Sequence, residues 1–296
     1  RTLQPGDLFL ALEGERFDGH KFVAQALVKG AIAAITRQGT ITDDTPRIEV
    51  ADTLAAYQAL GRWWRQRLGL PVVAITGSVG KTTTKELISA ALGTHGSVHK
   101  TRANFNNEIG VPKTLLEVTA KHDYAVVEMG MRARGEIALL TQTAQPNVGV
   151  ITNVGTAHIE QLGSEQAIAE AKCELLAEMS ADGIAVLNYD NPRLMRTAAQ
   201  VWAGKIITYG LTGGDIHGQV EGQTVTVDGV ALPVPLEGRH NALNYLSAIA
   251  TLQALNLDWR PLAQGLALEM PAGRAQRHTL ANDIVLLDET YNAGAQ

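Results

Sequence analysis

The feature that most constrains the fold is an apolar strand that runs into a glycine-containing loop and then into a helix. Residues 72–76 read Val-Val-Ala-Ile-Thr, the loop is Gly77–Gly80, and a helix is expected from Lys81 to about Leu92. Glycines let the backbone approach an anion, and the helix N-terminus adds N–H groups and the positive end of its dipole. The segment therefore predicts a phosphate-binding loop at the end of a buried strand.

Side chains directly after the loop suit a nucleotide polyphosphate. Lys81 can reach the β- and γ-phosphates, and the Thr82 hydroxyl can ligate Mg²⁺. The general phosphate loop has its first glycine where this chain has Ile75, so the spacing is a short variant. An ordinary glycine turn that opens a helix is the alternative. The nucleotide-binding residues expected in this segment are Gly77, Ser78, Val79, Gly80, Lys81, Thr82 and Thr83.

Apolar runs alternate with helical stretches along much of the chain. Strands are expected at residues 8–12, 31–35, 72–76, 124–127, 148–151, 184–187 and 284–287, and helices at 22–28, 54–68, 165–179 and 241–255. Continuous apolar strands between helices indicate a parallel sheet covered on both faces. The predicted fold class is therefore α/β, with a small antiparallel insertion at about residues 214–235.

Three domains are expected from changes in this pattern. They are a small first domain at residues 1–70, a central nucleotide-binding domain at 71–269, and the start of a third domain at 270–296. Only nine residues follow the last expected strand, so most of the third domain is expected to be absent. The chain begins at Arg1 rather than at methionine, so residues upstream are expected to have been lost.

Composition excludes several classes of protein. The net charge is −5 and no Lys/Arg run is present, which argues against nucleic-acid binding. Arg62, Arg65 and Arg67 are expected to form a solvated helix face. Cys173 is the only cysteine, so an internal disulfide and a cysteine-based zinc site are excluded. No apolar run approaches the length needed to cross a bilayer, and a cytoplasmic location is expected.

Glu128 is the first candidate ligand for a metal outside the loop. It ends the strand expected at residues 124–127, and open α/β sheets place ligands at the carboxyl ends of strands. Its carboxylate is a hard oxygen ligand that suits Mg²⁺. A carboxylate that caps a nearby helix is the alternative.

Several segments together resemble the Mur ligase family. The segments are Pro5–Leu12, Phe17–Phe22, Thr76–Glu86, Asn104–Pro112, Glu128–Gly130, Gly135–Ile137, Thr152–His158, Ala171–Glu174 and Gly238–Asn244. Within the family, Lys85-Glu86, Asn106–Glu108 and Asp288–Ala293 resemble the members that add D-alanyl-D-alanine. The resemblance implies a UDP-binding first domain, a central ATPase domain and a Rossmann-like carboxy-terminal domain that is truncated here.

The activity that the resemblance implies is an ATP-dependent ligation. D-alanyl-D-alanine would be joined to UDP-N-acetylmuramoyl-tripeptide through an acyl phosphate, giving ADP and phosphate, in peptidoglycan precursor synthesis. The partners are then ATP and these two substrates, with about two Mg²⁺ ions and a monomeric protein. Alternatives are a family member that adds meso-diaminopimelate or L-lysine, a nucleotide-binding protein that does not ligate, and an inactive fragment.

The resemblance also assigns roles to individual residues. It implies a catalytic group of Lys81, Glu128, His158 and Lys172, and metal ligands at Thr82, Glu128, His158 and, if carbamylated, Lys172. It implies further nucleotide contacts from Asn107, Asn241, Asn244, Arg274 and Asp288, and a UDP-substrate site at Asp18, Gly19, His20 and Phe22. From the residues alone, Lys172 is typical of a solvated helix lysine, His158 of a structural histidine, and Asp18-Gly19 of a turn.

One tetrapeptide matches a substrate motif of the family in the wrong place. Asp190–Arg193 reads Asp-Asn-Pro-Arg, which resembles the segment that holds diaminopimelate in some members. In those members the segment lies downstream of the adenine-side asparagines, whereas here it precedes Asn241. Because Asn-Pro favours turns, we interpret it as a turn.

Overall fold

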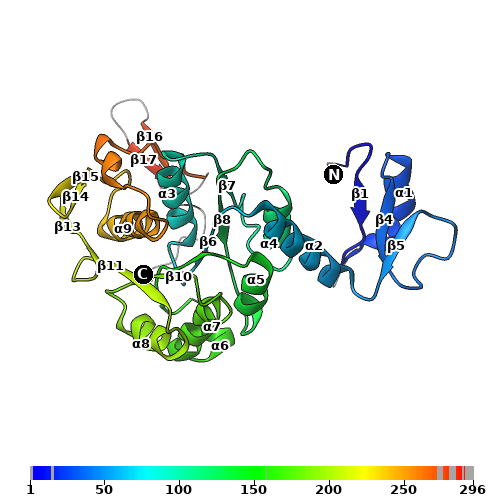
Figure 1. The fold of residues 1–296 in the computed structure, drawn as a ribbon, viewed down its shortest axis with the longest axis horizontal. Helices are drawn as coiled ribbons and strands as arrows, with labels where there is room; N and C mark the ends of the chain where they lie inside the picture. The colour runs from blue at the N-terminus through cyan, green and yellow to red at the C-terminus, as the bar shows by residue number, and fades with distance from the viewer. Residues whose placement is uncertain are drawn as a thin grey trace.

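A seven-stranded parallel sheet forms the centre of the molecule (Figure 1). The computed structural model describes residues 3–14, 17–157, 159–271, 276–279, 285–288 and 290. In spatial order the strands are β12 (Ile216–His217), β11 (Lys205–Gly210), β10 (Ile184–Asn188), β9 (Val148–Ile151), β6 (Val72–Thr76), β8 (Tyr124–Glu128) and β7 (Val98–Lys100). All six neighbouring pairs run parallel.

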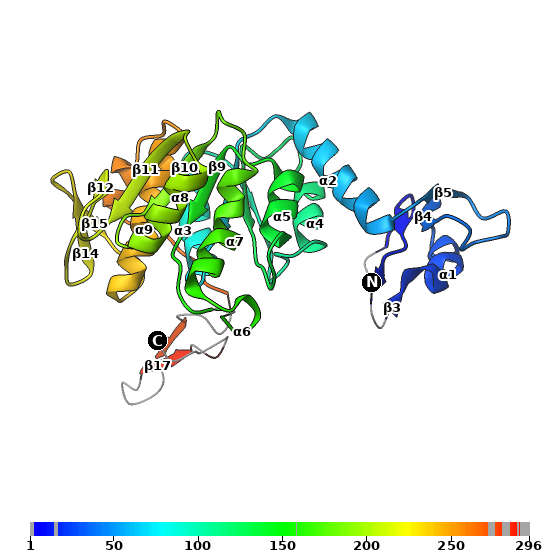
Figure 2. The same cartoon turned by 90° about the horizontal axis from the view of Figure 1, so that it is seen from below.

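Helices cover both faces of this sheet (Figure 2). One face carries α3 (Lys81–Gly93) and α9 (Arg239–Ala254), whose apolar side chains share a core with Val73 and Ile75 of β6. The opposite face carries α4 (Gly110–Leu116), α5 (Glu136–Ala144), α7 (Glu165–Ala177) and α8 (Pro192–Val201). Because strand side chains alternate between faces, Val72 and Ala74 belong to this second core.

The order of the strands places the phosphate loop at a turning point of the sheet. β6 lies between β8 and β9, so the chain runs to one side of β6 first and to the other side afterwards. Open α/β sheets bind ligands where strand order reverses in this way, outside the carboxyl ends of the strands. The predicted α/β class and the buried strands 72–76 and 148–151 are confirmed.

A smaller unit precedes the central sheet. Its three parallel strands are β1 (Leu8–Leu10), β4 (Ala33–Arg37) and β5 (Arg47–Val50), with β2 (Glu13–Gly14), β3 (Phe17–Asp18), a 3₁₀ turn η1 (Gly19–Phe22) and α1 (Val23–Val28). Its buried apolar cluster consists of only Ala11, Val23 and Ala34 among the residues that the structure describes. The first unit therefore has a much smaller core than the central one.

Helix α2 (Thr53–Leu68) extends from the first unit to the central sheet (Figure 2). Asp52 begins it as an N-cap, and Gly69 ends it in the left-handed conformation. Trp64 Nε1 donates to the carbonyl of Val118, 2.8 Å away, and a Cβ on Gly61 would lie 3.0 Å from Pro112 Cα. The expected boundary at residue 70 stays a prediction, but this helix packs on the central unit.

The predicted insertion is an antiparallel sheet of β13 (Gln219–Glu221), β14 (Thr224–Val227) and β15 (Val230–Pro233). After α9 and the 3₁₀ turn η2 (Arg260–Gln264), β16 (Gln276–Thr279) and β17 (Val285–Asp288) form an antiparallel pair. The strand expected at 284–287 thus pairs with an upstream strand. Among the described residues, no helix is long and apolar enough to cross a membrane.

Candidate functional site

The loop between β6 and α3 has the backbone geometry of an anion cradle. Gly80 is the N-cap of α3 with φ of +80°, a conformation that favours glycine. A Cβ on Gly77 would lie 1.9 Å from Thr152 Oγ1, so a larger residue does not fit there. The Lys81 ammonium donates to the carbonyls of Gly77 and Ser78, at 2.8 and 3.3 Å. Lys81 therefore already lies over the loop that a phosphate would fill.

The segment that follows β9 forms hydrogen bonds to the phosphate loop and holds it in place. Ser78 N donates to the carbonyl of Asn153 at 3.1 Å, and Val79 N donates to its side-chain Oδ1 at 3.1 Å. The Thr152 hydroxyl donates to the carbonyl of Val79 at 2.7 Å, and Gly155 N donates to Ser78 Oγ at 2.9 Å. These contacts explain why residues 152–155 belong to the same site as the loop.

A second group of side chains holds that bracing segment. Asn188, the last residue of β10, donates from Nδ2 to the carbonyl of Thr152 at 2.9 Å. Asn191 donates from Nδ2 to the carbonyl of Val154 at 2.9 Å. The loop shape is thus fixed through hydrogen bonds that extend across β6, β9 and β10.

The Asp-Asn-Pro-Arg segment is a helix-capping turn, as interpreted from the sequence. Asn191 Oδ1 accepts from Leu194 N at 3.0 Å and so caps α8, with Pro192 in its first turn. The Asp190 carboxylate accepts from the backbone N–H groups of Leu211 and Thr212.

The first turns of α9 bring two asparagines against the start of α3. Asn244 Oδ1 accepts from the Thr84 hydroxyl at 3.3 Å, and a Cβ on Gly80 would lie 2.8 Å from the same oxygen. Asn241 lies one turn earlier, and its Oδ1 accepts from Asn244 Nδ2 at 3.4 Å. Both side chains are buried.

Glu128 ends β8 beside the loop and is almost completely buried, with 2% of its surface exposed. Its Oε1 accepts from Asn106 Nδ2 at 2.8 Å, and its backbone N–H donates to Thr101 Oγ1 at 3.0 Å. Its Oε2 is buried without a hydrogen bond among the described residues, and Lys85 Nζ lies 3.8 Å from it. The carboxylate does not cap a helix in these contacts, so the alternative interpretation is not supported.

An unsatisfied, buried carboxylate oxygen near a phosphate loop fits a divalent cation. Mg²⁺ requires oxygen ligands and is held in proteins by few side chains together with substrate phosphates. Glu128 Oε2 supplies such an oxygen. Thr82 lies in the first turn of α3, next to the loop, and its hydroxyl can supply a second oxygen ligand. Thr82 and Glu128 are therefore the described side chains best suited to hold the ion.

Lys172 is a buried titratable group of the site with a strongly lowered pKa. It lies on α7 with 2% of its surface exposed, so the interpretation as a solvated helix lysine is wrong. Burial, followed by the charge of Lys81, lowers the pKa of Lys172 from 10.5 to about 7. A substantial share of the amine, about half, is thus uncharged at neutral pH. Burial raises the pKa of the neighbouring Cys173 to about 12, which makes that thiol unreactive.

The remaining nucleotide candidates differ in what the structure shows. Asn107 Oδ1 accepts from the backbone N–H of Gly110, the first residue of α4, at 2.9 Å. Asp288 ends β17, and its Oδ1 accepts from the Thr290 hydroxyl at 2.7 Å. His158 and Arg274 lie outside the described residues, and their roles stay predictions.

The first-unit candidates form a turn around a buried histidine. His20 Nδ1 lies 2.8 Å from Asp18 Oδ1, and its Nε2 accepts from Arg37 N at 2.9 Å. The ring therefore carries its proton on Nδ1, and both nitrogens are occupied. A Cβ on Gly19 would lie 2.7 Å from the carbonyl of Leu12. The turn interpretation of Asp18-Gly19 is confirmed, while Phe22 stacks on Phe17 at the surface, with ring centroids 5.4 Å apart.

Glu13, Asp18 and His20 lie close enough together to suggest a metal site. Glu13 Oε1, however, pairs with Arg37 NH2 at 3.2 Å, and neither nitrogen of His20 is available. This group is explained by ion pairing within the first unit.

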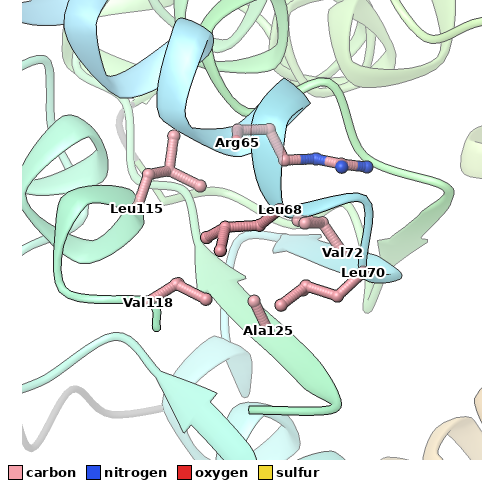
Figure 3. Close-up of a pocket in the computed structure, with 7 residues that line it drawn as sticks. All are labelled: Arg65, Leu68, Leu70, Val72, Leu115, Val118 and Ala125. Atoms are coloured by element: carbon pink, nitrogen blue, oxygen red, sulfur yellow. The ribbon is translucent and has the colours of Figure 1, made fainter. Parts of the chain in front are cut away.

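A small apolar cavity lies where α2 meets β8 (Figure 3). Its volume is about 10 Å³, and it is lined by Arg65 and six apolar residues. Such a space has the size of one water molecule but lacks polar partners for it. The cavity is therefore a packing gap and not a substrate site.

Four residues of the site received no role from sequence reasoning. Lys85, Glu86 and Asn106 were noted only as marks of the resemblance, and Lys100 was not noted. The structure brings Lys85, Glu86, Asn106 and Glu128 together in a buried polar cluster, with Lys100 at its outer edge. The one signal in the sequence for this cluster is the pair of adjacent charged residues at 85–86, directly before the apolar residues Leu87 and Ile88.

Family models match two parts of the chain. The model described as "Mur ligase middle domain" matches residues 75–252. The model described as "Mur ligase family, catalytic domain" matches residues 1–60.

A curated relative and two solved structures match nearly all of the chain. The UDP-N-acetylmuramoyl-tripeptide–D-alanyl-D-alanine ligase of Synechocystis is 59% identical over all of this chain and 66% of its own length. A MurF crystal structure from Acinetobacter baumannii gives a TM-score of 0.91 at 34% identity, covering 99% of this chain and 67% of that one. MurF from Thermotoga maritima in complex with ADP gives 0.86 at 32% identity, covering 99% and 70%. The chain thus spans about two thirds of the length of these relatives.

Proposed function

Because the chain belongs to the Mur ligase family, we propose that its protein adds D-alanyl-D-alanine to UDP-N-acetylmuramoyl-tripeptide with cleavage of ATP to ADP and phosphate. The observation that carries this proposal is the junction of the Gly77–Lys81 loop with buried Glu128 at the switch point of the sheet. The 59% identical relative bears the name of this activity. Peptidoglycan precursor synthesis is the corresponding process.

The loop residues bind and orient the triphosphate. Backbone N–H groups at residues 80–83 would face an anion at the start of α3, where the helix dipole adds positive potential. Lys81 exchanges its contacts with Gly77 and Ser78 for phosphate oxygens. Asn241, Asn244, Arg274 and Asp288 are proposed to contact the nucleoside, and Asn107 to orient this side of the site.

Thr82 and Glu128 are the residues proposed to hold a first Mg²⁺, and His158 and Lys172 a second. When bound, Mg²⁺ neutralises phosphate charge and stabilises the charge that develops during phosphoryl transfer. Asn106 fixes Glu128 by its hydrogen bond to Oε1, so that Oε2 is the oxygen that would ligate the metal.

Lys172 is proposed to act as a carbamate. Its uncharged amine attacks CO₂, a C–N bond forms, and one proton is released, so that the side chain becomes an anion. The pKa of about 7 makes the uncharged amine abundant at neutral pH. A negative group next to Lys81 also removes the repulsion between the charges of Lys81 and protonated Lys172.

The reaction then proceeds through two displacements. A carboxylate oxygen of the tripeptide attacks the γ-phosphorus, and the bond to ADP breaks. The D-alanyl-D-alanine amine attacks the acyl phosphate, loses a proton and displaces phosphate. Lys81 stays with the transferring phosphoryl group and offsets its charge throughout.

The first unit is proposed to bind the UDP portion. Phe22, exposed and stacked on Phe17, offers an aromatic surface next to the Asp18–His20 turn. The same proposal includes domain boundaries at residues 70 and 269. It also includes a monomeric protein in the cytoplasm, where ATP is available.

Phosphate release by the complete protein tests the proposal. UDP-N-acetylmuramoyl-tripeptide and Mg·ATP are supplied with D-alanyl-D-alanine, meso-diaminopimelate or L-lysine in separate reactions. Release is expected only with D-alanyl-D-alanine. Release with another amine identifies a different ligase of the family, and equal release without the muramyl compound overturns ligation altogether.

A further inference from the structure

Four charged side chains form a row of alternating sign behind the phosphate loop. Lys100 of β7 contacts Glu86 Oε2, and Lys85 Nζ lies 3.1 Å from Glu86 Oε1. The same ammonium lies 3.8 Å from Glu128 Oε2. The order along the row is thus Lys100, Glu86, Lys85 and Glu128.

The inner three members of the row are withdrawn from water. The exposed fractions of Lys85, Glu86 and Glu128 are 1%, 3% and 2%. Buried charges require compensating charges, because desolvation is costly and is offset only by close partners. The row satisfies this requirement in the absence of a metal, since two ammonium groups face two carboxylates.

The two contacts of Lys85 are unequal. The 3.1 Å separation from Glu86 is a direct ion pair, whereas the 3.8 Å separation from Glu128 is looser. Glu128 Oε2 has no hydrogen bond among the described residues. Lys85 can therefore leave Glu128 and still keep a buried anionic partner.

We propose that Lys85 is a positioning residue that occupies Glu128 Oε2 until a divalent cation replaces it, and that Glu86 retains the displaced ammonium. The inference rests on the proposed function in one respect, namely that Glu128 binds Mg²⁺. Lys85 then sets how much Mg²⁺ the nucleotide site requires, because its ammonium and the metal compete for one oxygen.

Nucleotide binding as a function of Mg²⁺ measures this competition without turnover. The affinity for ADP is determined calorimetrically at rising Mg²⁺ concentrations. The midpoint is the Mg²⁺ concentration at which the affinity for ADP has made half of its total Mg²⁺-dependent increase. Lys85→Met removes the competitor, so the midpoint is expected to fall roughly tenfold, as for one lost charge interaction at this range. Glu86→Gln removes the alternative partner, so Lys85 stays with Glu128 and the midpoint is expected to rise.

A stability-matched variant separates this effect from general loosening of the fold. Leu194→Ala truncates a fully buried side chain of α8 and is expected to leave the midpoint unchanged. Glu86→Gln keeps the test decisive if Lys85→Met does not fold. Midpoints of both charge variants equal to the wild-type value overturn the role of Lys85. A wild-type ADP affinity that does not respond to Mg²⁺ overturns the proposed metal site instead.

Discussion

Two glycines begin helices in the same left-handed conformation but have different surroundings. Gly80 caps α3 with φ of +80°, and Gly135 caps α5 with φ of +83°. A Cβ on Gly80 would lie 2.8 Å from Asn244 Oδ1, whereas a Cβ on Gly135 would meet nothing within 4 Å. Substitutions at these two glycines therefore distinguish two effects. Both measure the free-energy cost of a side chain in the left-handed conformation, and only the one at Gly80 adds a steric clash at the nucleotide site.

Gly80→Ala is expected to lower ADP affinity at least tenfold, because the methyl group displaces Asn244 and the loop. Gly135→Ala is the matched control and is expected to leave the affinity unchanged. Both variants should lose about 1 kcal/mol of unfolding free energy from the left-handed conformation alone. Calorimetry with ADP and urea unfolding measure the two quantities, and equal affinities for both variants would contradict this account of Gly80.

Lys172 makes stability depend on pH in a defined direction. Its pKa is about 7 in the folded protein and 10.5 ordinarily, so the unfolded chain binds more protons between these values. Stability therefore increases as pH rises from 7 towards 10.5, and it is reduced at and below neutral pH. In metal-free buffer without CO₂, the gain from pH 7 to pH 9 due to this group is about 2 kcal/mol.

Lys172→Met should remove that gain, because methionine fills the buried space without a titratable group. Urea unfolding at pH 7 and pH 9 compares the two proteins. The stability of the variant relative to the wild type should be greater at pH 7 than at pH 9. A constant difference would show that the lysine is not buried as an uncharged amine.

At the scale of elements, Arg65 makes three of the hydrogen bonds that join α2 to the central unit. The Arg65 guanidinium donates to the carbonyls of Ala144 and Gln145 at 3.2 and 3.1 Å, and to Asn147 Oδ1 at 2.7 Å. These acceptors include the end of α5, and burial lowers the pKa of Arg65. The expectation of a solvated arginine face is therefore wrong for Arg65.

Arg65→Met is expected to reduce the free energy of unfolding by about 2 kcal/mol, because it leaves three acceptors without a charged donor. Arg67→Met is the control on the same helix, since Arg67 is exposed and lies over the Trp63 ring. Its loss should stay under about 1 kcal/mol. Equal losses in thermal or urea unfolding would show that the contacts of Arg65 contribute nothing specific.

Elements with long apolar patterns were predictable, and those held by tertiary contacts were not. The β6–α3 unit and β9 agree with the sequence pattern, because each buries continuous apolar residues. β7 was not predicted, since Val98–Lys100 has only one apolar residue and gains its pairing from β8. Helix α8 was likewise missed, although residues 190–193 were interpreted as a turn, and the structure shows that this turn caps the helix.

The residues of the candidate site likewise fall into those that the sequence predicts and those that only tertiary contacts bring together. Lys81 and Glu128 follow from their positions after buried strands, which a single sequence shows. The contact of Glu128 with Asn106 joins residues 22 positions apart and depends on the β8–β7 arrangement. From the residues alone, Lys172 was expected to be exposed to solvent. Its position in a helix does not reveal which face of that helix packs against the rest of the protein.

At the scale of the whole molecule, the two units differ in the size of their cores, and this predicts unequal local stability. Both faces of the central sheet carry large buried clusters, whereas the buried cluster of the first unit consists of Ala11, Val23 and Ala34 among the described residues. Amides of β4 are therefore expected to exchange with deuterium faster than those of β6, since local opening costs less where less apolar surface is buried. Mg·ADP should slow exchange at the β6–α3 junction and leave β4 unchanged, because none of the residues proposed to contact the nucleotide lies in the first unit. Hydrogen exchange measured by mass spectrometry with and without Mg·ADP tests both statements. Equal rates in β4 and β6, with equal slowing by the nucleotide, would mean that the two units open as one cooperative body.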